Sequence, residues 1–104
     1  MIGISARVEL APADVTEYAS YAKKIIPLTL AEKGCQLYGM AIDITNPNII
    51  WISEEWDSES DLFAHLASPH ILDFLAFTEK LNIVNMDVRK YDISAAGPLV
   101  VPEA

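Results

Sequence analysis

Apolar residues occupy every second position from Ile2 to Leu10, and small or charged residues stand between them. Because successive side chains of a strand point to opposite faces, this alternation predicts a β-strand with one buried face. Pro12 lacks the backbone N–H that a strand ladder needs, so we expect the strand to end before it.

The pattern then changes to helical spacing. Apolar side chains recur at intervals of three and four over residues 15–26, which predicts a helix with one apolar face. Asp14, followed three residues later by Glu17, is typical of the capping box that begins a helix. Pro27 is expected to kink or interrupt this helix, and Gly34 to stop it.

A hairpin of two strands is predicted next. Residues 35–44 have the alternation of a strand, and turn-forming residues at 45–48 connect them to a second strand over Ile49–Trp56. Much of this second strand is apolar on both faces. That composition favours burial on both sides.

A second helical region follows the hairpin. Ser58, with Asp61 three residues later, predicts the start of a helix. Ser68 and Pro69 divide the region, because proline is favoured in the first turn of a new helix. Apolar residues at helical spacing continue to about Leu81.

A last strand is predicted at 84–93, and a tail at 95–104 contains a short apolar run. The element order is therefore β-α-β-β-α-β. This order predicts an α+β fold of the ferredoxin-like kind, with a four-stranded antiparallel sheet and helices on one face. At 104 residues we expect a single domain, residues 1–104.

The composition predicts self-association. Hydrophobic residues make up 52% of this small chain, and two helices cover one sheet face only. A second copy of the sheet, packed face to face, would cover the other, so we expect a homodimer. The tail at 95–104 either adds a strand to the partner or is a loose terminus. We see no apolar run long enough to span a membrane and no signal peptide.

Charge and cysteine content narrow the class of partner and compartment. The net charge of −8, with scattered basic residues, disfavours binding to nucleic acid. Cys35, the single cysteine, cannot form an internal disulfide, so we expect a reducing cytoplasm and a structural role for it. The sequence contains no glycine-rich phosphate loop, no CxxC pair and no clustered metal ligands. We therefore predict neither a cofactor nor a metal.

His65 and His70 are the two histidines of the chain, the residue type that ordinarily changes charge near neutral pH. Five residues of helix rotate by about 500°, which leaves the two rings roughly 140° apart and disfavours a shared metal. His65 shares a helix stripe with Leu62 and Leu66, so it should point toward the sheet. It is either a structural histidine on a buried carboxylate or a base in a pocket between helix and sheet.

Glu54 and Trp56 share one strand face with Ile50 and Ile52. If helices cover that face, the carboxylate is buried and its pKa rises unless it is paired. Glu54 then either stabilises the fold by accepting hydrogen bonds or tunes His65 or a substrate. Trp56 is either core or a donor to a ligand through its indole N–H.

Several short motifs together point to a known family. They are Glu-Lys-Gly-Cys at 32–35, Tyr38, Asn46-Pro47, Glu54-Glu55-Trp56, His65-Leu66 and Ser68-Pro69-His70. In these residues the chain resembles the antibiotic biosynthesis monooxygenase family, which are small dimeric α+β-barrel proteins. The resemblance extends over most of the chain, from about residue 2 to residue 93.

The resemblance implies a cofactor-independent oxygenase acting on a small aromatic phenol or quinol. In such proteins the substrate is deprotonated and donates an electron to O₂, while the protein supplies a dry pocket and proton-transfer groups. The residues carried over as catalytic are His65, Trp56 and Glu54, and those carried over as substrate pocket are Tyr38, His70, Phe74 and Ile52. His65 would remove the proton, and its neighbours would hydrogen-bond the phenol oxygen.

Other activities remain open. A related branch degrades haem with an Asn on the first strand and a Trp and a His in the second helical region. This chain lacks that Asn, and no Trp or further His follows at the matching places. The alternatives are a non-enzymatic protein that binds a small apolar ligand, and an isomerase or decarboxylase on the same scaffold. A His65 that lines a cavity favours an enzyme, whereas one held away from any cavity favours binding alone.

Overall fold

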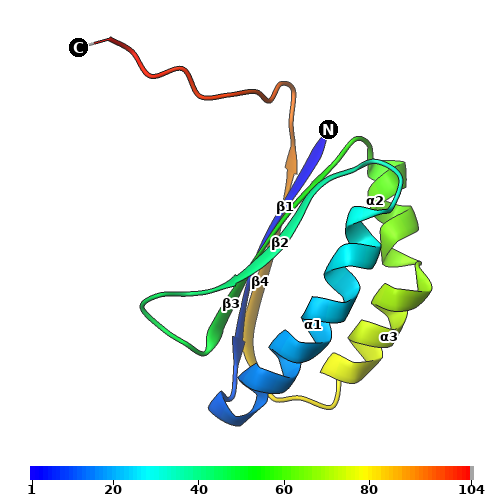
Figure 1. Cartoon of the computed structure of the whole chain (residues 1–104), viewed down its shortest axis with the longest axis vertical. Coiled ribbons are helices and arrows are strands. Elements are labelled where there is room, and N and C mark those ends of the chain that lie inside the picture. Colours follow the sequence, from blue (N-terminus) through cyan, green and yellow to red (C-terminus); the bar gives the residue numbers. More distant parts are fainter. Residues whose placement is uncertain (104) are drawn as a thin grey trace.

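The computed structural model of the chain describes residues 1–103 (Figure 1). Ala104, the last residue of the predicted tail, lies outside the described residues. The elements follow in the order β1 (Ile2–Leu10), a 3₁₀ turn η1 (Pro12–Asp14), α1 (Val15–Leu30), β2 (Cys35–Ile42), β3 (Ile49–Trp56), α2 (Glu59–Leu66), α3 (Pro69–Thr78) and β4 (Ile83–Asp92).

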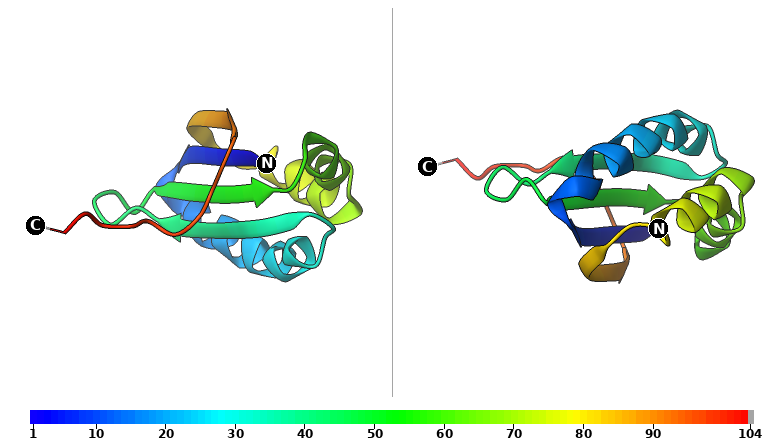
Figure 2. Two further views of the ribbon diagram at one scale, coloured as in Figure 1. Left: turned by 90° about the horizontal axis from the view of Figure 1, so that it is seen from above. Right: turned by 90° about the horizontal axis from the view of Figure 1, so that it is seen from below.

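The four strands form one antiparallel sheet in the order β2-β3-β1-β4. All three α-helices lie on the same face of it, and the other face is free of helices (Figures 1 and 2). The predicted ferredoxin-like α+β fold is confirmed, with the second helical region present as two helices. Within residues 1–103, no helix has the length and apolar content that a membrane crossing requires.

The strand register explains which residues are buried. Opposite Ile4 of β1 stands Glu54 of β3, and opposite Ala6 stands Ile52. These pairs share the face that the helices cover, as the alternation predicts. The main core cluster then joins this face to α1 and α3, with Val8, Leu10, Ile50, Tyr18, Ala22, Ile25, Ile71 and Phe74 all buried.

Two predicted helix boundaries differ from the structure. Helix α1 runs without interruption from Val15 to Leu30, so Pro27 does not break it. Pro27 lies in the last turn, where its missing N–H costs one hydrogen bond and its carbonyl still accepts from Ala31 N at 3.3 Å. Asp14 stands at the N-cap position, but its carboxylate accepts from the backbone N of Asn82 at 2.8 Å instead of capping the helix.

Two other predicted boundaries are confirmed, and one strand is shorter than predicted. Ser58 Oγ accepts from the backbone N of Asp61 at 3.2 Å, which confirms the predicted cap of α2. Gly34 has a φ of +80°, a conformation that favours glycine, and it turns the chain from α1 into β2. Strand β2 ends two residues early, because the Asp43 carboxylate folds back to accept hydrogen bonds from Thr45 and Trp51.

No helix covers the β4 edge of the sheet in the part of the chain that the structure describes. Helices cover the β2–β3–β1 part of the sheet, whereas every residue of β4 is exposed. Met86 and Val88, which face the helix side, are each more than half exposed. The tail beyond β4 extends away from the sheet (Figure 1), with Leu99 and Val100 exposed.

Candidate active site

A cavity of about 240 Å³ lies between the sheet and the α2–α3 pair. Its walls are mostly apolar, and they include Ile83, Met86 and Val88 of the exposed strand β4. The polar side chains in its lining are Tyr18, Tyr38, Glu54, His65 and Thr78. Of the residues predicted for the site, the cavity brings together Tyr38, Ile52, Glu54, His65 and Phe74.

Helix α2 presents His65 from its last turn, and the ring is only 2% exposed. The ring lies against the Trp56 indole with centroids 4.6 Å apart and meets Tyr38 edge-on at 5.4 Å. Its Nδ1 is 2.6 Å from Oε2 of Glu32, and its Nε2 is 4.0 Å from Oε1 of Glu54.

The hydrogen bond to Glu32 favours one tautomer of the neutral His65 ring. A carboxylate can only accept, so Nδ1 carries the hydrogen that is donated to Glu32. In the neutral ring Nε2 is then an acceptor, and it faces Glu54 in the cavity wall. The buried ring therefore presents a proton-accepting nitrogen to the cavity side, in the arrangement of a general base that a second carboxylate orients.

Glu54 is a half-buried carboxyl group on the helix-covered face of β3. Burial raises its pKa, while a hydrogen bond from Trp56 Nε1 at 3.0 Å and the neighbouring His65 act in the opposite direction. Trp56 itself is fully buried behind Glu54 and does not line the cavity. Its contribution is to hold the Glu54 carboxylate in place.

Two tyrosines complete the polar lining. Burial, reinforced by the negative charge of Glu54, raises the pKa of Tyr18 to about 12. The same two causes raise the pKa of Tyr38 further. Both phenols are therefore neutral in ordinary buffers, and each hydroxyl can donate a hydrogen bond.

His70 lies outside the cavity lining, on the far side of His65. Its Nε2 is 3.0 Å from the same Oε2 of Glu32 that His65 contacts. The predicted divergence of the two rings is wrong, because α2 ends at Leu66 and α3 begins anew at Pro69. The helical rotation between the two histidines is interrupted there.

Glu32 was missed as a site residue by reasoning from the sequence. It lies in the turn between α1 and β2, 33 positions from His65, so no local spacing connects the two. The one signal available was the Glu-Lys-Gly-Cys motif, which ends in the left-handed Gly34. That motif served only as a marker of the fold.

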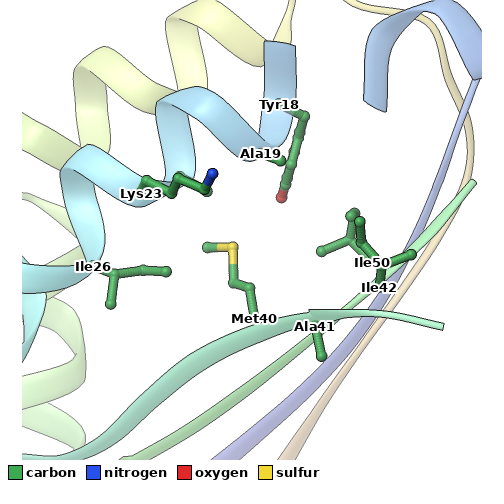
Figure 3. Close-up of a pocket in the computed structure, with 9 residues that line it drawn as sticks. Tyr18, Ala19, Lys23, Ile26, Met40, Ala41, Ile42 and Ile50 are labelled. Carbon is green, nitrogen blue, oxygen red and sulfur yellow. The ribbon is translucent and has the colours of Figure 1, made fainter. Parts of the chain in front are cut away.

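A second hollow of about 200 Å³ lies between α1 and β2. Figure 3 shows the Tyr18 hydroxyl and Met40 pointing into it, with Lys23 at its rim. Its lining contains no histidine and no carboxylate. The histidine and the carboxyl group predicted for the site both lie in the other cavity, at His65 and Glu54.

The fold and the cavity define a class of small α+β proteins with a pocket between sheet and helices. The sequence model of the antibiotic biosynthesis monooxygenase family matches residues 1–76, and the chain belongs to that family. The resemblance seen in the sequence is thereby confirmed.

Relatives and solved structures agree. The chain is similar to the Probable quinol monooxygenase YgiN of Escherichia coli (strain K12), 33% identical over 76 residues that cover 64% of this chain and 70% of that protein. A conserved protein from Methanosarcina mazei Go1 superposes with a TM-score of 0.81 at 29% identity, covering 86% of this chain and 89% of that one. Rv0793 from Mycobacterium tuberculosis, at 22% identity, shows the fold, with a TM-score of 0.85 over 93% of this chain and 98% of that one.

Proposed function

We propose that this protein is a monooxygenase that oxidises a small aromatic phenol or quinol with O₂ and without a bound cofactor. One observation carries the proposal. His65 lines a largely apolar cavity and directs Nε2 to the cavity side, while Glu32 holds Nδ1 from behind. The similarity to a probable quinol monooxygenase supports the same substrate class.

In the proposed reaction, His65 Nε2 accepts the acidic proton of the substrate. The resulting anion is electron-rich and reduces O₂ directly. For a substrate with a CH₂ group activated by a phenol, two hydrogens leave and one oxygen atom enters as a carbonyl. The other oxygen atom becomes water, so the substrate supplies all four electrons.

The cavity supports this chemistry through its surroundings. Apolar walls that include Ile52 and Phe74 limit the access of water to the reactive anion. Tyr38, held neutral by burial, offers a hydrogen bond to the substrate oxygen. The volume of about 240 Å³ is below the usual range for drug-sized ligands and favours a small substrate.

The test is oxygen uptake by chelator-treated protein with a panel of hydroquinones and anthrone-like phenols. The wild type is compared with His65→Gln, and with Asp73→Asn on the exposed face of α3 as a matched control. Uptake above the uncatalysed rate that falls only in His65→Gln supports the proposal. Saturable binding of panel compounds without oxygen uptake would contradict the proposal and support the non-enzymatic binding function.

The proposal includes a homodimer formed through the sheet. Leu37, Trp51 and Tyr91 lie on the face without helices and are each at least 40% exposed. A second sheet packed on this face would bury them. Sedimentation at micromolar concentration should give twice the chain mass, whereas a compact monomer would contradict the dimer.

The unpaired Cys35 suits a reducing compartment, and a cytoplasmic location is part of the proposal.

A further inference from the structure

Three metal-binding side chains converge behind the cavity. Glu32 follows α1, His65 ends α2 and His70 begins α3. One donor atom from each lies within 4.8 Å of the other two. The two imidazole nitrogens, Nδ1 of His65 and Nε2 of His70, are 2.6 Å and 3.0 Å from a single carboxylate oxygen of Glu32.

The chemistry of this donor set favours some metal ions over others. Two imidazoles and one carboxylate form the ligand set of many zinc sites in which water occupies a fourth position. Borderline transition metals such as Zn²⁺ and Co²⁺ prefer it, whereas Mg²⁺ and Ca²⁺ prefer oxygen ligands. Donors about 2.0–2.2 Å from a tetrahedral metal stand roughly 3.3–3.5 Å apart. The two spacings from Glu32 to the histidine nitrogens would therefore need to open by less than about 1 Å.

Neighbouring groups hold the cluster in place. Ser68 Oγ donates to the backbone carbonyl of His65 at 2.6 Å, which ties the end of α2 to the start of α3. The hydroxyl oxygens of Thr29 and Ser68 lie 3.2 Å and 3.4 Å from Nε2 of His70. Such hydroxyls can accept from a metal-bound water and orient the ligands.

Charge and access also suit a cation. Among the described residues, the ion pairs of Glu32 are with the two histidines alone, so no Lys or Arg competes for its carboxylate. The His70 and Glu32 side chains are 17% and 18% exposed, whereas the His65 side chain is 2% exposed. His70 also lines an open hollow together with Asp73 and Lys24. The two more exposed donors therefore lie on the side of the cluster away from the cavity.

We propose that Glu32, His65 and His70 form a binding site for one divalent transition-metal ion of the zinc class. The site shares the His65 ring with the cavity but uses its other nitrogen, because Nδ1 faces Glu32 whereas Nε2 lies on the cavity side. The inference does not depend on the reaction proposed above, since the donors and their geometry are the same whatever the cavity binds.

The experiment is a titration of the chelator-treated full chain with Co²⁺, followed by its visible absorption, and with Zn²⁺, followed by calorimetry. We expect one ion per chain and a Co²⁺ spectrum of low coordination number. Loss of one second-sphere partner typically lowers metal affinity 10–100-fold, so loss of a ligand in His70→Ala should lower it at least about 100-fold. Asp73→Asn, which lies in the same hollow outside the donor set, should bind like the wild type.

A second variant keeps the test independent of folding defects. Glu32→Gln preserves the size of the side chain and one acceptor oxygen but removes the negative charge, and should also weaken binding strongly. Circular dichroism and thermal unfolding establish that both variants are folded. The proposal is overturned by absence of stoichiometric binding to the wild type. Binding that folded His70→Ala and Glu32→Gln retain at wild-type affinity overturns it too, because the ion then lies elsewhere.

Discussion

The two sides of the His65 ring differ in almost every physical respect. On one side Nδ1 makes a short 2.6 Å hydrogen bond to Glu32, in a cluster of four polar side chains that includes His70, Thr29 and Ser68. On the other side Nε2 faces an apolar cavity and approaches Glu54 only to 4.0 Å. The closed side orients the ring, and the open side leaves a nitrogen available for chemistry.

The largest effect should come from removing the nitrogen on the open side. His65→Gln retains a polar side chain but has no basic nitrogen, so oxygen uptake with a responsive quinol should fall by about 10²–10⁴-fold, the usual contribution of a general base. Steady-state kinetics should show the loss in kcat, with little change in KM. A variant that keeps wild-type kcat would remove the distinction between the two sides.

The next largest effect should come from truncating a side chain in the wall of the cavity. Phe74 is buried and meets Tyr18 edge-on, with ring centroids 5.2 Å apart. Phe74→Ala should lower the free energy of unfolding by about 3–5 kcal/mol, as large-to-small changes in cores do. Leu72→Ala, at a side chain 52% exposed on the same helix, should cost less than about 0.5 kcal/mol in the same urea titration. Equal losses would show that α3 does not pack as described.

Burial of Tyr18 predicts that the free energy of unfolding falls at alkaline pH. Burial raises the pKa of Tyr18 from 10.0 to about 12. The folded state therefore holds this proton more tightly than the unfolded state, and stability is present in full below pH 10 and lost as the pH rises to about 12. The loss amounts to about 2–3 kcal/mol. Tyr18→Phe should flatten that part of the stability curve, and a curve as steep as that of the wild type would contradict the assignment.

The smallest effect should come from the closed side. Ser68→Ala removes the hydrogen bond from Ser68 Oγ to the carbonyl of His65, and should cost about 1 kcal/mol of unfolding free energy. Ser20→Ala, on the exposed face of α1, serves as the control and should be nearly neutral. A neutral Ser68→Ala would show that this contact does not join α2 to α3 energetically.

Local patterns were sufficient for the fold. Alternation identified β1, β2 and β4, because the sheet has one helix-covered face that fixes the period of two, and the turn residues before Ile49 identified β3. Ser58 and Asp61 identified the start of α2, because a cap depends on neighbours three residues apart. The predicted kink or interruption at Pro27 was wrong, since the cost of a proline depends on its distance from the helix end.

The site was predictable only where it lies on one regular element. Glu54 and Ile52 follow from the period of β3, and His65 follows from the stripe of α2. The contact of His65 with Glu32 closes a loop of 33 residues, and that with His70 depends on the angle between two helices. Neither distance is encoded in a local spacing.

The position of His65 between the cavity and the donor cluster has a thermodynamic consequence. One imidazole would serve both sites, so their occupancies are linked through a single ring. A cation on Nδ1 would leave the ring hydrogen on Nε2, and the cavity would then face a donor instead of an acceptor. By reciprocity, whatever factor Zn²⁺ imposes on the affinity of a phenol, that phenol must impose on the affinity of Zn²⁺. The affinity of the cavity for a phenol would then depend on the concentration of free metal ion, through the tautomer of one buried side chain.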